Sequence, residues 1–320
     1  MVLFLIASLA AADTCSAYGP PETIATLKNS PVKESSGVVQ SRSRNGVWFT
    51  HQDKGHDPSI FAFDLDGNFI EEHEVKNADN FDWEDIAAGP CPRGNDECLY
   101  IGDIGDNDED RGGIIVYVVP EPKEGKSTRA IERWTGVYPE EPQDAEALMV
   151  HPCTGRVHVV TKDDDGESRI YRFPSAPGKD TVELESVGTV FVDGAEASAR
   201  QVTAGDFDAD GDRVVIRTGN SIREWVIDPE KPNDHWLNPP IEIEGAAEFQ
   251  GEGIAYSDNG DLITTSEGNP MTISRVPCVE TVRAQHECVY ESQGCGCASS
   301  SAPVAGWLIL PLLGLFRRRS

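Results

Sequence analysis

The residues best suited to chemistry are polar side chains that recur at one position of a repeated pattern. Five segments start with an acidic or polar residue and run on into small and apolar residues: ESSGVV from Glu34, DWEDIAAGP from Asp82, DAEALMVHP from Asp144, QVTAGDFDADG from Gln201 and QGEGIAYSDNG from Gln250. Aligned, they place in one row Ser36, Glu84, Glu146, Thr203 and Glu252. An outer row, two residues earlier in each segment, consists of Glu34, Asp82, Asp144, Gln201 and Gln250. Residues i and i+2 of a strand share a face, so both rows are expected to point the same way.

A second run follows each segment and ends in another polar residue: His51, Asp103, Lys162, Arg217 and Glu267. The rows together predict a ring that is acidic in several repeats, with one Lys and one Arg interleaved. Crowded anions raise one another's pKa or recruit a cation, and hard oxygen ligands favour Ca²⁺ over zinc. The acidic glycine-rich loop at 102–110 adds Asp106. We therefore predict calcium ligands at Glu84, Asp103, Asp106, Glu146, Glu252 and Glu267, and ligand-binding side chains at His51, Lys162 and Arg217.

This ring is compatible with three classes of function. The first is a binding or scaffold module, stabilised by calcium, for a small-molecule or surface ligand. The second is a metal-dependent hydrolase, in which bound metal activates water against a phosphate ester or a similar anionic substrate. In the third, the glutamates hydrogen-bond backbone amides of neighbouring repeats and the protein is purely structural. The pattern leaves the catalytic residues unassigned.

The elements that would position such a ring are short strands. The runs are rich in Val, Ile, Tyr, Phe and Thr, and Asp-Gly pairs at 66–67, 165–166 and 210–211 supply hairpin turns. The unit recurs every 48 to 62 residues, usually with a third and a weaker fourth run. Such units bury their faces by packing around an axis. The sequence predicts an all-β propeller with five four-stranded blades, leaving room for a sixth, and ETIATLK at 22–28 as the outer strand of the last blade. A β-sandwich is the main alternative, which the long period disfavours.

The repeat also resembles a group of secreted bacterial propellers related to the SdiA-regulated and phytase-like propellers. The resemblance rests on ESSG at 34–37, DWEDIAAGP at 82–90, LYIGDIGDN at 99–107, VYVVPEP at 116–122, DAEAL at 144–148 and GEGIA at 251–255. It covers nearly all of residues 30–277. It implies the propeller fold, makes phosphate-ester hydrolysis conceivable and assigns no activity.

The N-terminus and the cysteines indicate export. Residues 2–12 form an apolar run that ends in Ala10-Ala11-Ala12, as in a cleavable signal peptide over 1–12; a buried N-terminal strand is the alternative. Export implies an oxidising compartment in which disulfides persist. Short spacing predicts two disulfides, Cys91 with Cys98 and Cys278 with Cys288, while Cys15 and Cys153 either pair or stay free.

The last residues follow the ectodomain predicted over 13–293. In the tail, 294–320, the Gly-Cys-Gly-Cys element holds Cys295 and Cys297, and an apolar stretch at 302–316 leads into an Arg cluster at 317–319. The stretch is short of the roughly 20 residues of a stable span. This order resembles the MYXO-CTERM sorting tails, which implies a processing protease and anchoring at the cell surface or outer membrane, or release after processing. An ordinary tail anchor is the alternative; either way the tail alone contacts membrane.

Composition narrows the partners. The 55 acidic residues outnumber the 27 Lys and Arg, for a formal net charge of −28. That field repels phosphate backbones and anionic lipid, which excludes nucleic acid as a partner. The GKST segment at 125–128 lacks the earlier glycine of a phosphate-binding loop, because Pro120 stands there. Neither G-x-S-x-G nor H-E-x-x-H occurs in the sequence.

Overall fold

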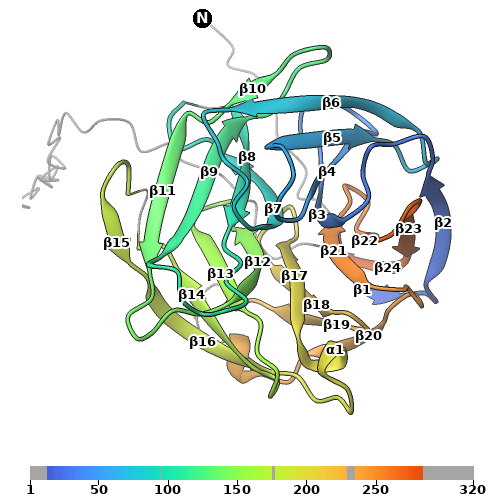
Figure 1. Ribbon diagram of the computed structural model, residues 1–320. Helices are drawn as coiled ribbons and strands as arrows, with labels where there is room; N and C mark the ends of the chain where they lie inside the picture. Colours follow the sequence, from blue (N-terminus) through green and yellow to red (C-terminus); the bar gives the residue numbers. More distant parts are fainter. Residues whose placement is uncertain (1–12, 95, 175–176, 229–234, 284–320) are drawn as a thin grey trace, which may run out of the picture.

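Alternating apolar residues and tight turns place the strands close to where the sequence predicts them. The computed structural model describes residues 13–94, 96–174, 177–228 and 235–283. In this part of the chain five four-stranded sheets surround a common axis, so the prediction of a five-bladed β-propeller is confirmed (Figure 1). The glycines of the three Asp-Gly turns, Gly67, Gly166 and Gly211, have φ of 82°, 84° and 72°, which glycine adopts without strain.

Each blade is an antiparallel meander whose innermost strand begins near the axis. Blade 1 contains β3 (Ser35–Gln40), β4 (Trp48–Gln52), β5 (Ser59–Phe63) and β6 (Phe69–Lys76), and blade 2 contains β7 (Trp83–Pro90), β8 (Glu97–Asp103), β9 (Ile114–Pro120) and β11 (Glu132–Val137). Blade 3 contains β12 (Ala145–Val150), β13 (Val157–Thr161), β14 (Glu167–Arg172) and β16 (Glu185–Phe191), and blade 4 contains β17 (Val202–Phe207), β18 (Arg213–Thr218), β19 (Ser221–Val226) and β20 (Ile241–Glu244). Blade 5 contains β21 (Gly251–Tyr256), β22 (Leu262–Ser266), β23 (Met271–Val276) and β2 (Glu22–Leu27).

Short elements decorate the outside of the ring. Two strands, β10 (Thr128–Arg129) and β15 (Thr181–Glu183), pair in parallel with the outer strands β6 and β11. The helical segments of the described residues are α1 (Ala197–Arg200) and a 3₁₀ turn (His235–Leu237). No helix in these ranges is long and apolar enough to cross a bilayer.

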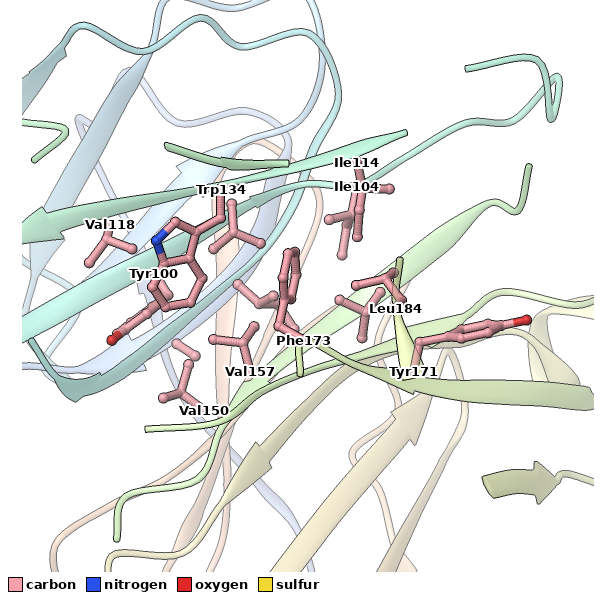
Figure 2. Packing of buried hydrophobic residues seen from close by; sticks show 14 of the residues in the cluster. Tyr100, Ile104, Ile114, Val118, Trp134, Val150, Val157, Tyr171, Phe173 and Leu184 are labelled. Carbon is pink, nitrogen blue, oxygen red and sulfur yellow. The ribbon is translucent and has the colours of Figure 1, made fainter. Parts of the chain in front are cut away.

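The core is divided among the five interfaces between neighbouring blades. Each innermost strand packs beside that of the next blade, in the cyclic order β3, β7, β12, β17, β21. Figure 2 shows the interface of blades 2 and 3, where Trp134 packs on Tyr100 and Phe173 with ring centroids 5.7 and 5.9 Å away. Trp83 is fully buried between blades 1 and 2. Large aromatic side chains therefore seal the blades together.

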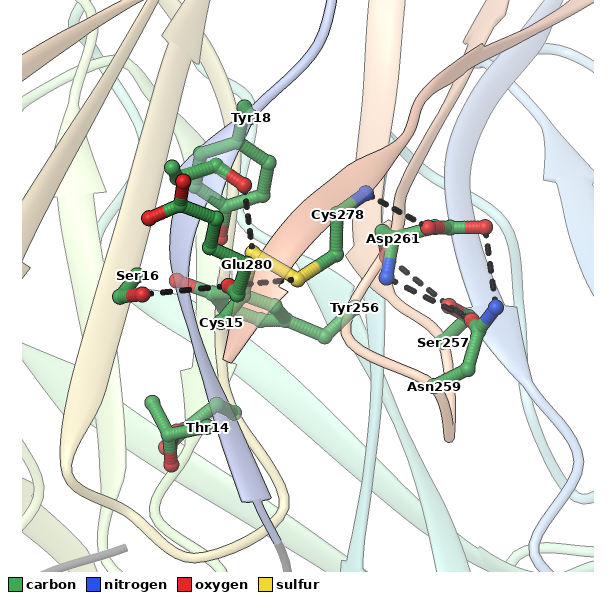
Figure 3. Close-up of a disulfide and its surroundings, with 12 residues drawn as sticks. Thr14, Cys15, Ser16, Tyr18, Tyr256, Ser257, Asn259, Asp261, Cys278 and Glu280 are labelled. Carbon is green, nitrogen blue, oxygen red and sulfur yellow. Dashed lines mark hydrogen bonds between the residues drawn. A yellow bond between two sulfur atoms is a disulfide. The ribbon is translucent and has the colours of Figure 1, made fainter. Parts of the chain in front are cut away.

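The ring closes through its N-terminal segment. The strand β2 pairs with β23 of blade 5, which confirms the outer strand predicted at 22–28. The preceding strand β1 (Asp13–Tyr18) pairs with β24 (Cys278–Arg283), and a disulfide joins Cys15 to Cys278 (Figure 3). It closes a loop of 263 residues, which in the chain-entropy account stabilises the fold by roughly 5 kcal/mol.

The cysteine predictions have a mixed outcome. Cys91 and Cys98 form a disulfide, as predicted. The predicted bond between Cys278 and Cys288 is wrong, because ring closure brings Cys15 to Cys278 with their Cα atoms 5.7 Å apart. Cys153 therefore does not pair with Cys15. The predicted signal peptide, Cys288, and the tail with Cys295 and Cys297 lie outside the described residues.

Candidate functional site

A β-bulge in every innermost strand positions the aligned polar residues. The register shifts lie between Ser35 and Val38, Trp83 and Asp85, Ala145 and Ala147, Val202 and Ala204, and Gly251 and Ile254. Each shift spans the residue that the alignment puts in the row. A bulge re-aims a side chain, so five bulges at equivalent positions build one ring. Glu34, Asp82, Asp144, Gln201 and Gln250 lie just before their strands, so a shared strand face is not what unites the two rows.

Two members of the ring hold neighbouring blades together. The Ser36 hydroxyl donates to the carbonyl oxygen of Glu84 in blade 2. The Thr203 hydroxyl donates to the carbonyl oxygen of Glu252 in blade 5, at 3.1 Å. The amide-binding role that the sequence suggested for the glutamates belongs to two aspartates instead: Asp85 accepts from the amide of Leu148 in blade 3 at 2.9 Å, and Asp206 accepts from the amide of Tyr256 in blade 5 at 3.0 Å. The carboxylate of Glu146 accepts from Lys162.

Glu84, Glu146 and Glu252 are buried and repel each other. Burial raises the pKa of Glu84 well above its usual range, and the charges of Glu146, Asp53 and Asp82 raise it further. Burial raises the pKa of Glu146 to about 8, although the ion pair with Lys162 opposes that shift. Burial also raises the pKa of Glu252. Burial alone would lower the pKa of Lys162, but the charge of Glu146 and its hydrogen bond outweigh that effect and raise the pKa.

Further charged groups complete what we call the acidic mouth of the propeller. Burial raises the pKa of Glu267 to about 7, and the charges of Glu252, Asp53 and Glu34 add to the shift. We define the mouth by the side chains of Asp53, Lys54, Asp82, Glu84, Asp144, Glu146, Lys162, Glu252 and Glu267. Its carboxylates outnumber its two ammonium groups. Uncompensated negative charge of this kind favours an added cation.

The densest part of the mouth lies where blades 1 and 2 meet. Asp53 follows β4, Asp82 precedes β7 and Glu84 lies in β7; each offers a carboxylate oxygen within 4.8 Å of the others. Asp82 is 6% exposed, and its buried Oδ1 accepts no hydrogen bond. The nearest cation to this oxygen is the exposed Lys54 ammonium, 3.7 Å away. Three carboxylates thus lie close enough together to share one cation, and a buried oxygen of Asp82 accepts no hydrogen bond.

The backbone beside these carboxylates is kept clear by Gly105. A methyl group at this position would overlap Oε1 of Glu84 and approach the Asp82 carboxyl carbon to 2.7 Å. The amide of Gly105 donates to the carbonyl oxygen of Asp82 at 3.2 Å, which holds the loop against β7. Only glycine leaves room for both side chains here.

Two predicted calcium ligands instead shape the loop after β8. Asp103 accepts hydrogen bonds from Arg111 Nη2 at 2.7 Å and from the amide of Asp82 at 3.2 Å. Asp106 accepts from the amides of Asp110 and Arg111 at 3.0 and 2.8 Å. Their oxygens are engaged in these bonds and do not join the group of Asp53, Asp82 and Glu84.

Two of the predicted ligand-binding residues lie between blades. Arg217 donates to Glu248 at 2.9 Å and to the carbonyl oxygens of Gly253 and Thr265 at 2.9 and 3.3 Å, so its guanidinium is engaged. His51 is fully buried, with its ring 5.7 Å from that of Trp83. Burial lowers the pKa of His51 to about 4, which makes it neutral at physiological pH.

Sequence reasoning missed Asp53. The sequence pattern predicts His51 as the polar end of the second strand of blade 1, but its ring packs on Trp83, and the carboxylate of Asp53, just after the end of β4, reaches the mouth instead. The available signal was the run THQDK, where the first carboxylate after the strand is Asp53. Asp82 stood in the outer row and was left out of the predicted ligands.

Comparisons with known proteins show no matching family model and no match among curated proteins. Solved structures with a similar fold include U3-55K, at 11% identity over 76% of this chain and 67% of that one (TM-score 0.38). An auxiliary nutrient binding protein from Bacteroides thetaiotaomicron is 10% identical, with 86% of this chain and 68% of that one covered (TM-score 0.43). The calcium-binding protein regucalcin from Agrobacterium tumefaciens is 12% identical, with 88% of this chain and 100% of that one covered (TM-score 0.47). At these values function must be argued from the site itself, and the resemblances to phytase-like propellers and sorting tails stay predictions.

Proposed function

We propose that this protein is an exported binding module whose acidic mouth takes up Ca²⁺ on Asp53, Asp82 and Glu84. The observation that carries the proposal is the buried Oδ1 of Asp82, which accepts no hydrogen bond, inside a group of three carboxylates. Zinc prefers nitrogen and sulfur ligands, which this group lacks. Ca²⁺ takes six to eight oxygens in flexible geometry, so carbonyl oxygens, water and a bound ligand complete its shell.

The cation has two consequences for the molecule. It bridges blades 1 and 2, since Asp53 belongs to one and Glu84 to the other. It also offsets the repulsion that raises the pKa of Glu84. Bound there, Ca²⁺ would supply further coordination positions to which an oxygen-bearing ligand could bind. Lys162 contributes less to an anion than its charge suggests, because its ammonium group already donates a hydrogen bond to Glu146.

Thermal unfolding tests the proposal. Millimolar Ca²⁺ is expected to raise the melting temperature by roughly 5 °C relative to EDTA, because a ligand of the folded state stabilises it. Asp82→Asn should lose this response, whereas Asp57→Asn, an exposed aspartate outside the group, should keep it. Identical melting curves of the native protein with Ca²⁺ and with EDTA would refute the calcium site.

A metal-dependent hydrolase is the second candidate, and Glu267 favours it. A carboxyl with a pKa near 7, half-buried beside the mouth, suits proton transfer at neutral pH. In this role Glu267 would take a proton from metal-bound water that attacks a phosphate ester. Native protein with Ca²⁺ is then expected to turn over a phosphomonoester panel, and Glu267→Gln should lower the rate about 100-fold. Absence of turnover by native protein would leave the binding role alone.

Surface anchoring through the tail completes the proposal. The disulfides Cys15–Cys278 and Cys91–Cys98 fit an oxidising compartment outside the cytoplasm. Deleting residues 298–320 is expected to release the protein into the medium, because it removes the apolar stretch and the Arg cluster. Fractionation with an antibody measures this, and a protein that stays cell-bound after the deletion would rule out the tail as anchor.

A further inference from the structure

A groove lined by positive charges, opposite in sign to the acidic mouth, lies on the outer edge of blades 1 and 2. The chain leaves β9 at Pro120, crosses to blade 1, forms β10 against β6 and returns to blade 2 as β11. This detour encloses a groove of about 320 Å³, lined by the four cations Lys76, Lys123, Lys126 and Arg129 and the single acid Glu121, with Pro122 and Ile131 as apolar walls. We call it the basic groove. It is a cationic surface on a chain whose net charge is −28.

The cations of the groove are largely uncompensated. Among the described residues, no carboxylate oxygen lies within 4.0 Å of the charged nitrogens of Lys123, Lys126 or Arg129, and Lys76 is 3.8 Å from Glu74. These side chains are exposed, so water screens their mutual repulsion. An anion in the groove would gain from several of them at once.

Two acids at the groove, Glu71 and Glu121, are engaged by other groups. Glu71 accepts hydrogen bonds from Arg44 at 2.8 Å and from the amide of Gly125 at 2.6 Å. Glu121 accepts from the amide of Arg42 at 3.0 Å and from the Ser43 hydroxyl at 2.7 Å. Each of these bonds draws a carboxylate away from the lysines, and this leaves the groove positive.

The segment that carries the cations is held in place. The Lys126 amide donates to the Lys123 carbonyl oxygen at 3.0 Å, and the buried His73 ring donates to the Lys126 carbonyl oxygen at 2.6 Å. The Thr128 hydroxyl donates to the Pro120 carbonyl oxygen at 2.7 Å. A loop fixed in this way lowers the entropy cost of binding. Because the Gly125 amide is engaged by Glu71, side-chain cations rather than backbone amides must hold an anion.

Charge and size restrict the occupant. At physiological ionic strength fields decay over about 8 Å, so a small anion in the groove feels mainly the local cations. A polymer or an anionic bilayer would extend over the acidic surface around them and be repelled. The groove has no aromatic lining on which bases could stack. Its volume is at the lower end for small-molecule sites.

We propose that the basic groove binds a compact, multiply charged phosphate compound, either a free phosphate or a phosphate ester, held by Lys123, Lys126 and Arg129. Lys76 contributes from the opposite wall, and Pro122 and Ile131 contact the apolar face of the bound molecule. The site is independent of the acidic mouth. It gives the molecule a second binding function on the outer edge.

Calorimetric titration of the full-length protein tests the proposal, with pyrophosphate and a sugar bisphosphate as probes and EDTA present to prevent metal-bridged binding at the mouth. The triple variant Lys123→Gln, Lys126→Gln, Arg129→Gln should weaken binding at least about tenfold, because three attractive charges are lost. The matched control Lys28→Gln, Lys179→Gln, Arg283→Gln has the same change in net charge at exposed positions elsewhere and should bind as the native protein does.

Binding of the sugar bisphosphate but not pyrophosphate would support the proposal and identify the ester as the source of the phosphate. Binding of pyrophosphate alone would support it for free phosphates. The proposal is overturned if native protein binds neither probe at millimolar concentration, or if the control variant loses as much affinity. It is also overturned if only heparin or phosphatidylserine vesicles bind through these residues. None of these outcomes depends on the calcium response of the mouth.

Discussion

The acidic mouth and the basic groove are both crowded with like charges, yet they are built in opposite ways. The mouth collects carboxylates from four blades and buries them, so they need bulges, the Lys162 ion pair and a cleared backbone at Gly105. The groove takes its cations mostly from one loop and leaves them in water. Burial makes charge expensive, because the interior screens poorly. We therefore expect the same type of substitution to change the stability of the protein more in the acidic mouth than in the basic groove.

The largest difference is expected for loss of a lysine. Lys162→Met removes the partner of buried Glu146 and should lower the free energy of unfolding by about 2 to 3 kcal/mol. Lys123→Met in the groove should change it by less than about 0.5 kcal/mol. Urea unfolding measures both. Equal losses in the two variants would mean that burial does not distinguish the regions.

The pH dependence of stability should come from the mouth. The folded-state pKa of Glu146 is about 8 and that of Glu267 about 7, so the folded protein holds protons that the unfolded chain releases. In EDTA, the free energy of unfolding should therefore fall by about 2 kcal/mol between pH 6.5 and 8. The lowered pKa values of His51, His151 and His158, near 4, 4 and 3, keep these side chains neutral in the folded protein, but the unfolded chain still binds protons at them near pH 6.5, which offsets part of the fall. Asp208, whose pKa burial raises to about 7, adds to it.

Two variants identify the groups responsible for this fall of the free energy of unfolding with pH. Glu146→Gln should remove most of the decline, whereas the groove variant Lys123→Met should leave it unchanged. Ca²⁺ should also reduce it, because the cation favours ionised carboxylates. A slope that survives Glu146→Gln would place the titrating groups elsewhere.

Gly105 tests how tightly the mouth is packed. Gly105→Ala pushes a methyl group against Glu84 and Asp82, which should cost about 1 to 2 kcal/mol and abolish the calcium-dependent rise in melting temperature. Gly112→Ala is the matched control, since an added Cβ there meets no atom within 4 Å. Calorimetry with and without Ca²⁺ compares the pair. A full calcium response in Gly105→Ala would show that the cation binds elsewhere.

The smallest effect concerns Lys54, whose ammonium lies beside the three carboxylates. It competes with a divalent cation, so Lys54→Met should tighten Ca²⁺ binding about fivefold, as expected for one charge in a well-hydrated position. Lys126→Met removes a charge from the groove and should leave Ca²⁺ affinity unchanged. Titration with a calcium indicator measures both dissociation constants. Weaker binding by the Lys54 variant would contradict competition.

The sequence determined the parts of this structure that depend on local pattern. Alternation, Asp-Gly turns and a repeat of roughly fifty to sixty residues predicted the blades, and ETIATL predicted the strand that closes the ring at β2. The short loop between Cys91 and Cys98 likewise predicted a disulfide that forms. These predictions are correct because backbone sterics and side-chain alternation act over a few residues.

Tertiary structure alone decided which side chains meet. The bulges turned Ser36 and Thr203 to neighbouring carbonyl groups. The packing of blade against blade enclosed His51 and Arg217 and brought Asp53 to Asp82 and Glu84. Ring closure joined Cys15 to Cys278 across 263 residues, where spacing had favoured a nearer partner. Such contacts depend on how five sheets twist and pack around one axis, and that geometry cannot be derived from any single strand.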